Sequence, residues 1–418
     1  MKYENNIEFA MQMDSTDPLH SYRMKFHIPK KQDGNDVIYF AGNSLGLQPK
    51  RVRAFVEQEL LDWEKMGVEG HMHAKYPWLP YHELLTSQTA RLVGAQPDEV
   101  VNMNSLTVNL HLMMVSFYRP TRERNKILIE ANAFPSDHYA VQSQIKFHGY
   151  DPAECLLEMK PRSGEVNIRT EDIIERIEKE GDSIALVMFA GVNYYTGQAF
   201  DFERITAAAH KKGCLVGFDL AHAAGNFKLE LHKWACDFAV WCSYKYLNGG
   251  PGAIAGAFVH QKHLLDMTIP KFWGWWGQDK ATRFLMGHNY QPIPTVESWQ
   301  LSNPPILQLA ALRASLDIFH EAGMDALRLK SEMLTGYAEY LINENNDGNI
   351  EIITPAAANE RGCQLSIRAK SNGKALHTKL NESGVVCDWR EPDVIRIAPV
   401  PLYNTFEDVW NFVKLLYN

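Results

Sequence analysis

The sequence predicts an α/β protein whose core is a mostly parallel sheet covered by helices on both faces. Two observations lead to this fold class. Between about residues 100 and 259, short apolar runs rich in β-branched residues alternate with helical stretches, a pattern typical of layered βα units. Beyond residue 305 the alternation gives way to a long helical stretch followed by a few short strands. That second pattern indicates a smaller α+β domain at the C-terminal end.

The first region contains five candidate strands and two clear pairs of helix boundaries. Thr170 is expected to cap a helix that ends at Gly181, and Asp201 is expected to start a second helix that ends at Gly213. Parallel strands are buried on both faces and are therefore nearly continuous apolar runs. The candidate strands are Lys126–Ile129, Ile184–Phe189, Cys214–Phe218, Phe238–Trp241 and Ile254–Val259.

The C-terminal region is expected to hold one long helical stretch, from about Ile306 to Asn343, then short strands and a final helix at about Asp408–Leu416. The expected strands are Ile350–Ile353, Cys363–Ile367 and Ile395–Ile397. Because no Gly/Ser linker or repeat separates the two regions, they should pack closely. We expect an N-terminal segment (1–50) that packs with the small domain, a large domain (51–305) and a small C-terminal domain (306–418).

Composition favours a folded protein without a nucleic-acid or membrane partner. The 418-residue chain is 45% hydrophobic and 22% charged, with a net charge of −8, and it has no basic block of the kind that phosphate-backbone binding requires. No run approaches the roughly 18 to 20 apolar residues of a membrane span, and the first residues do not resemble a signal peptide. The six cysteines have no CxxC spacing, which is typical of reduced thiols in a cytoplasmic protein.

The residues that say most about chemistry are Asp219 and Lys245, which lie at the ends of neighbouring apolar runs. Pyridoxal 5'-phosphate (PLP) needs a lysine amine to hold its aldehyde and an acid to keep its ring nitrogen protonated. Asp219 and Lys245 are candidates for these two roles. Carboxylates and lysines at strand ends are also common in α/β proteins. On spacing alone, Asp219 could instead cap the next segment and Lys245 could be an ordinary exposed lysine.

Three further positions could contact such a cofactor. The segment from Asn104 to Asn109 opens a helical pattern, so its hydroxyls and free backbone N–H groups could receive a phosphate, or could simply cap the helix. Phe134 follows a strand and could stack on a flat ring, although a single Phe is more often part of the core. His222 could contact the cofactor or be a structural histidine.

Several other kinds of site have no support in the sequence. The chain lacks the GxGxxG and GxxxxGK[ST] motifs of dinucleotide and nucleoside triphosphate sites and the GxSxG motif of serine hydrolases. His71, His73 and His82 match no zinc spacing, and HExxH is absent. We therefore expect no metal site.

Longer stretches of the sequence resemble the kynureninase family, which belongs to the class V aminotransferase-like group of fold-type I PLP enzymes. Phe-Pro-Ser-Asp-His-Tyr (134–139) and Cys-Ser-Tyr-Lys-Tyr-Leu-Asn (242–248), in this order, are highly specific. The similarity extends from about residue 40 to the C-terminus and implies that the large domain binds PLP. The other matching segments are 41–50, 104–111, 217–226, 274–277, 301–306 and 395–404.

The resemblance implies the positions of the cofactor contacts. Lys245 should hold the PLP aldehyde covalently, with Asp219 facing the pyridine nitrogen. Ala190 departs from the pattern, because relatives often have Ser or Thr there, and one secondary cofactor contact is thereby in doubt. The residues implied around the ring are Phe134, Ser136, Asp137, Asp219 and His222. Those implied around the phosphate are Leu106, Thr107 and Tyr244.

The resemblance also implies a homodimer with shared active sites, since Trp275 and Asn303 are similar to residues that reach the site of the second subunit. Arg396 matches the position that clamps the substrate α-carboxylate, a role suited to the paired donors of a guanidinium. The remaining positions implied in the substrate pocket are Ser44, His71, Ser302 and Asn303.

The activity that the resemblance implies is hydrolysis of L-kynurenine or 3-hydroxy-L-kynurenine to anthranilate or 3-hydroxyanthranilate and L-alanine, in tryptophan catabolism and NAD biosynthesis. Lys245 would act as the base, and Tyr244 would relay protons.

Three rival functions are weaker. A cysteine desulfurase needs a cysteine nucleophile in the late-middle region, and no cysteine lies between Cys242 and Cys363. An aminotransferase has the same cofactor chemistry and stays open. A scaffold of this fold without turnover is disfavoured, because the reactive positions are retained.

Overall fold

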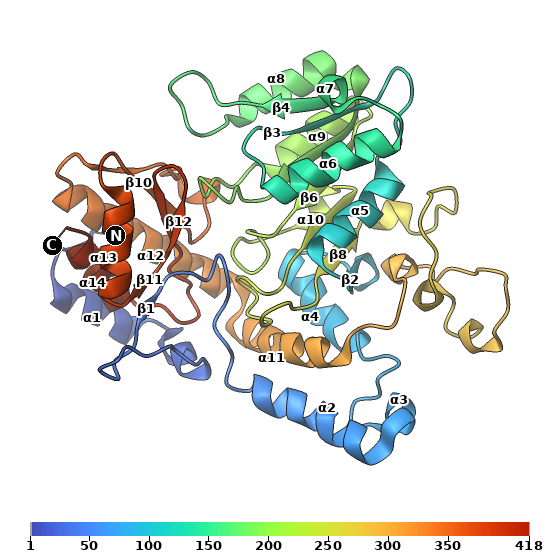
Figure 1. Cartoon of the computed structure of the whole chain (residues 1–418), viewed down its shortest axis with the longest axis horizontal. Helices are drawn as coiled ribbons and strands as arrows, with labels where there is room; N and C mark the ends of the chain where they lie inside the picture. The colour runs from blue at the N-terminus through green and yellow to red at the C-terminus, as the bar shows by residue number, and fades with distance from the viewer. Residues whose placement is uncertain (1, 418) are drawn as a thin grey trace.

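The computed structural model describes residues 2–417, which form a larger unit and a smaller unit (Figure 1). The described part of the larger unit contains a seven-stranded sheet of order β2-β8-β7-β6-β5-β3-β4. Its strands are β2 Val100–Asn102, β3 Lys126–Glu130, β4 Leu156–Met159, β5 Ile184–Ala190, β6 Leu215–Asp219, β7 Phe238–Trp241 and β8 Gly256–Val259.

The predicted α/β fold with a mostly parallel sheet is confirmed. Strands β4, β3, β5, β6 and β7 are parallel to one another, whereas β8 runs antiparallel to both β7 and β2. The five predicted strands correspond to β3, β5, β6, β7 and β8, with ends shifted by two residues or fewer. The edge strands β2 and β4 were not predicted.

Helices cover both faces of this sheet because successive side chains of each strand point to opposite sides. In β7, for example, Ala239 and Trp241 belong to one apolar core, whereas Phe238 and Val240 belong to the other. Helices α4, α8, α9 and α11 contribute to the first core, and α5 and α6 to the second. The helices of this unit are α2 Val52–Met66, α3 Gly70–His73, α4 Glu83–Val93, α5 Leu106–Phe117, α6 Pro135–Phe147, α7 Pro152–Cys155, α8 Thr170–Glu180, α9 Phe202–Lys211, α10 Leu231–Trp234 and α11 Ile306–Ala322.

The boundaries of α8 and α9 show one wrong and one correct capping prediction. Thr170 is the first residue of α8 and not its cap, because Arg169 holds the extended conformation of the cap position. Asp201 does cap α9, since its side chain accepts a hydrogen bond from the backbone N–H of Arg204 at 3.0 Å. Gly213 follows α9 with a φ of +72°, a conformation that glycine adopts without strain.

The smaller unit contains an antiparallel sheet of order β12-β13-β10-β9. The long helical stretch expected from Ile306 is two helices, because Gly323 adopts a φ of +75° between α11 and α12. The elements of this unit are α12 Met324–Asn345, β9 Ile350–Ile352, β10 Leu365–Ala369, α13 Gly373–Glu382, β11 Val385–Val386, β12 Asp388–Arg390, β13 Val394–Ile397 and α14 Phe406–Tyr417.

The N-terminal residues lie against the end of the chain, and both termini are on the smaller unit (Figure 1). Helix α1 (Ile7–Thr16) packs on α14, and the carboxylate of Asp14 accepts hydrogen bonds from the backbone N–H groups of Phe406 and Glu407 at 2.8 and 2.9 Å. Strand β1 (Ile38–Tyr39) pairs in parallel with β11. Among the described residues, none of the helices has the length and apolar character needed to cross a membrane.

Candidate active site

A cavity of about 80 Å³ lies where β3, β5 and β6 end. In α/β proteins this carboxyl edge is where ligands bind. Lys245 and all the residues expected around a cofactor ring and phosphate within one chain line the cavity: Leu106, Thr107, Phe134, Ser136, Asp137, Asp219, His222 and Tyr244. The remaining lining residues are Ala190, Val192, Tyr194 and Ala221.

Asp219 and Asp137 form a buried pair of carboxyl groups on the floor of this cavity. Asp219 is the last residue of β6, and its Oδ1 accepts a hydrogen bond from the backbone N–H of Ala221 at 2.7 Å. Burial raises the pKa of both carboxyl groups, and the charge of Asp219 raises the pKa of Asp137 further. The hydrogen bond between the two groups raises the pKa of Asp137 and lowers that of Asp219, so a proton on this pair is held mainly by Asp137.

Lys245 lies opposite this pair, in the segment that follows β7. Its ammonium donates a hydrogen bond to Nε2 of His222 at 3.0 Å. Burial, and secondarily the charge of Lys245, lowers the pKa of His222 well below its usual range, so the imidazole is neutral. The ring centroids of Phe134 and Tyr244 are each 5.9 Å from the lysine Nζ. Burial also raises the pKa of Tyr244, which keeps the phenol protonated.

The start of α5 gives the cavity a site suited to a phosphate. Leu106 and Thr107 are in the first turn of this helix, where backbone N–H groups have no partner within the helix. The Oγ1 of Thr107 is 3.0 Å from the Oγ of Ser136, which comes from the first turn of α6. Two helix starts and two hydroxyls thus converge on one end of the cavity, an arrangement that favours an anion.

Glu130 is a carboxyl group near this site that sequence reasoning missed. It is the last residue of β3 and is 1% exposed, and both of its carboxyl oxygens are 3.3 Å from the backbone nitrogen of Ala190. Burial raises the pKa of Glu130 to about 8, so this carboxyl is mostly neutral at neutral pH. A carboxylate at a strand end was a usable signal, but the predicted strand ended one residue earlier.

Arg396 is buried in the smaller unit, close to the cavity but outside its lining. Its side chain pairs with Asp388, and Nη1 donates a hydrogen bond to the backbone carbonyl of Tyr194 at 2.7 Å. Nη2 donates to the hydroxyl of Ser44 at 3.3 Å. The expected substrate residues Arg396 and Ser44 are therefore in contact, and Tyr194, which the sequence did not single out, connects them to the cavity.

Four other expected residues do not reach the cavity within one chain. His71 hydrogen-bonds through Nδ1 to the carbonyl of Val68 at 2.9 Å and packs against Trp78. Trp275 is 44% exposed, and its indole N–H donates to the carbonyl of Arg283. Ser302 and Asn303 are exposed.

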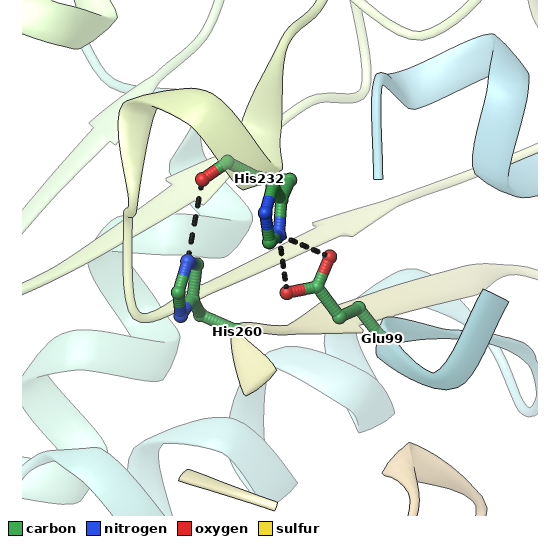
Figure 2. Close-up of side chains that lie close together, drawn as sticks. All are labelled: Glu99, His232 and His260. Atoms are coloured by element: carbon green, nitrogen blue, oxygen red, sulfur yellow. Dashed lines mark hydrogen bonds and ion pairs between the residues drawn. The ribbon is translucent and has the colours of Figure 1, made fainter. Parts of the chain in front are cut away.

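Figure 2 shows a group of side chains whose spacing would permit a metal ion, Glu99 with His232 and His260. The carboxylate of Glu99 accepts hydrogen bonds from His232 Nδ1 at 2.9 Å and from the backbone N–H groups of Gln96 and Gln261, each at 2.8 Å. In His260, Nε2 donates to the carbonyl of His232 and Nδ1 accepts a backbone N–H. Hydrogen bonds thus occupy the Glu99 and His260 atoms that would bind a metal, and we interpret the cluster as structural. The expected absence of a metal stays a prediction.

Comparisons with known proteins address the whole chain. The kynureninase of Koribacter versatilis is 60% identical over 412 residues, which cover 99% of this chain and 97% of that protein. The chain belongs to the kynureninase family. The kynureninase of Mus musculus is 51% identical over 426 residues, covering 97% of this chain and 92% of the mouse protein. The family described as kynureninase C-terminal domain matches residues 327–416.

Solved structures of more distant proteins share the fold of this kynureninase-family chain. A cysteine desulfurase from Thermococcus onnurineus superposes with a TM-score of 0.76 at 17% identity, covering 91% of this chain and 94% of that one. The cysteine desulfurase CsdA of Escherichia coli gives a TM-score of 0.75 at 15% identity, with coverage of 95% and 97%. This kynureninase-family chain therefore has the predicted fold-type I PLP transferase-like fold.

Proposed function

We propose that the protein is a PLP-dependent hydrolase that cleaves L-kynurenine, or its 3-hydroxy form, to L-alanine and anthranilate or 3-hydroxyanthranilate. The observation that carries this proposal is the single cavity in which Lys245, Asp219 and Phe134 meet the start of α5, in a chain of the kynureninase family. We assign a role to each of these residues from its contacts in the structure. The three-domain division of the chain also stays a proposal.

The polar groups of the cavity fit PLP. Glu130, Asp137 and Asp219 are three buried carboxyl groups, and the Lys245 ammonium faces the Asp137–Asp219 pair. A protonated pyridine nitrogen would supply a cation for Asp219. The buried Oδ1 of Asp137 and Nδ1 of His222 have no hydrogen-bond partner among residues 2–417, so they are available to ligand atoms. The phosphate would lie at the starts of α5 and α6.

Each residue then has a task that its surroundings support. PLP, when bound, supplies an electron sink that stabilises negative charge on substrate carbons. Lys245 would hold the cofactor aldehyde and, once released, would accept the substrate α-proton at Nζ, with the neutral His222 ready to accept its hydrogen bond. Asp219 would keep the ring nitrogen protonated. The protonated phenol of Tyr244 would give its proton to the substrate as the carbon–carbon bond breaks.

The substrate α-carboxylate would bind to Arg396 beside the cavity, where Ser44 and the carbonyl of Tyr194 now accept its hydrogen bonds. A guanidinium matches a carboxylate with two parallel N–H donors.

The test of the function is a visible absorption spectrum of the purified, PLP-supplemented protein before and after addition of L-kynurenine, with anthranilate fluorescence followed in the same cuvette. We expect a bound-cofactor band and release of anthranilate without any oxo acid. Turnover that depends on added 2-oxoglutarate would contradict the proposal in favour of an aminotransferase. Absence of a band would contradict PLP binding at Lys245.

We also propose a homodimer in which Trp275 and Asn303 complete the partner's site. The segment around residues 265–300 extends away from the sheet (Figure 1), and its exposed side chains include Trp273 and Phe284, at 69% and 52%. Such a projecting apolar surface is typical of an interface between subunits. The cysteines of the described residues are buried and unpaired, which supports the proposed cytoplasmic location.

The shared site predicts complementation between inactive variants. We expect Lys245→Ala and Asn303→Ala dimers each to have little activity, and a mixture exchanged through mild denaturation to regain it. In a mixed dimer, one site combines the intact Lys245 of one chain with the intact Asn303 of the other. Anthranilate release before and after exchange is the measurement. If mixed dimers form, as shown by a tag on one variant, and activity stays low, Asn303 does not act across the interface.

A further inference from the structure

Arg396 is held by three segments that are far apart in the sequence. Arg396 is 1% exposed and is one of the largest fully buried side chains of the described residues. Asp388 is its cross-strand neighbour on β12, Ser44 comes from the N-terminal segment and Tyr194 from the loop after β5. The last two contacts are to groups that a bound carboxylate could replace.

The contacts divide the guanidinium group into two edges. Asp388 binds the edge formed by Nε and Nη2, with its Oδ1 at 2.6 Å from Nε and its Oδ2 against Nη2. The opposite end, formed by Nη1 and Nη2, faces the carbonyl of Tyr194 and the hydroxyl of Ser44. The Ser44 hydroxyl in turn donates its proton to Asp388 Oδ2. The three side chains thus form a closed ring of hydrogen bonds.

We propose that Asp388 is a positioning residue that aims the Nη1–Nη2 end of Arg396 at the substrate carboxylate, and so makes the site specific for ligands that carry one. This inference rests on the proposed function, because it assumes a substrate with an α-carboxylate. A carboxylate bound to Nη1 and Nη2 leaves the edge held by Asp388 untouched. The orientation of Arg396 is therefore set before the substrate arrives.

The charges of the cluster suit this task. Burial alone would raise the pKa of Asp388, but hydrogen bonds from Arg396 and Ser44 and the charges of Arg396 and Arg390 lower it, so the carboxylate is ionised. Arg390 also contacts Asp388, at 3.3 Å. Two guanidinium groups around one carboxylate leave a net positive charge for the substrate. The Nε of Arg390 has no partner among the described residues.

Asp388 could instead act as a competitor that the substrate must displace. In that case its removal would strengthen carboxylate binding, because both guanidinium groups would be uncompensated. The geometry argues for positioning, since Asp388 and the open end of Arg396 lie on different edges of the same planar group. Removal of Asp388 should therefore weaken carboxylate binding if it is a positioning residue and strengthen that binding if it is a competitor.

The test is Asp388→Asn, which keeps the size of the side chain and turns an N–H toward the guanidinium group. We expect the KM for L-kynurenine to rise about 10-fold to 100-fold with kcat changed by less than about 3-fold, because a misplaced contact weakens binding more than chemistry here. The second readout is binding of L-alanine and of ethylamine, which differ only in the carboxylate, followed by the visible absorption of the PLP-loaded enzyme. L-Alanine should lose affinity and ethylamine should not.

The matched control is Asp172→Asn, which alters an aspartate of α8 whose two carboxylate oxygens accept hydrogen bonds from the guanidinium group of Arg162, at 2.6 and 2.9 Å, on the surface. It should leave both ligands unchanged. Equal weakening of L-alanine and ethylamine in Asp388→Asn, or an unchanged or lowered KM, would overturn the positioning role. If the wild-type protein cleaves neither L-kynurenine nor its 3-hydroxy form, the proposed function is wrong, and the L-alanine and ethylamine pair still decides the role of Asp388.

Discussion

Replacing Lys245 with alanine is expected to reduce anthranilate release by roughly 10⁴-fold or more, because the residue has two tasks that no neighbour can take over. It would hold the cofactor aldehyde and would accept the α-proton. His222, 3.0 Å from the lysine Nζ, is neutral but lacks an amine that could form a covalent link. The measurement is steady-state turnover together with the visible spectrum, in which the lysine-linked band should disappear.

A suitable control is Lys228→Ala, since Lys228 is half exposed and pairs only with Asp325 at 2.7 Å on the surface. This variant should keep wild-type turnover and spectrum. Lys245→Ala with near-normal turnover in the absence of added amine would show that another group performs its role. If a small primary amine restores some activity to Lys245→Ala, the proposed role of Lys245 is supported.

The second large effect is expected for Asp219→Asn, which should lower kcat by about 10²-fold to 10³-fold. The amide has nearly the same size, so it preserves packing around the end of β6, but it has no charge to stabilise a protonated ring nitrogen. The hydrogen bond between Asp137 and Asp219 would also change, because its ionised acceptor is lost. Turnover of L-kynurenine and the absorption maximum of the bound cofactor are the two readouts.

Asp182→Asn provides the comparison, because Asp182 is exposed and interacts with Lys212 on the surface. This variant should have the wild-type turnover of L-kynurenine and the wild-type absorption maximum of the bound cofactor. An Asp219→Asn enzyme with full activity would mean that ring protonation does not depend on this carboxylate. Retained cofactor affinity together with reduced kcat is the result that separates an electronic role from a loss of folding.

The sequence was sufficient to predict the central strands, because β5, β6 and β7 are continuous apolar runs. It was insufficient for the edge strands. β2 is three residues long and β4 is only partly buried, so neither has a distinctive pattern. Strand direction is also invisible to periodicity, which explains why the antiparallel course of β8 was not foreseen. Gly323 could have marked the break between α11 and α12, but a glycine inside a helical pattern is ambiguous.

The sequence likewise predicted some residues of the candidate site and missed others. Motif similarity was enough to identify most of the residues that line the cavity, since Lys245 and Phe134 are within long specific segments, but it did not identify Val192 or Tyr194. Contacts made by backbone atoms, or between strands of the smaller unit, correspond to no recognisable sequence motif. The carbonyl of Tyr194 has no side-chain signature, and Asp388 is opposite Arg396 only because β12 and β13 form a hairpin. Asn303, which is proposed to act across a subunit interface, does not line the cavity of its own chain.

The contact of α1 with α14 has a consequence for synthesis of the chain. Asp14 binds the backbone of Phe406 and Glu407, and β1 pairs with β11, so two segments within the first forty residues depend on partners among the last thirty-five. The ribosome releases those partners only at the end of translation. Until then the face of α1 that packs on α14 is uncovered, and Ser44 cannot reach Arg396. The large unit can fold while the chain is still growing, whereas the carboxylate end of the substrate pocket forms only after termination.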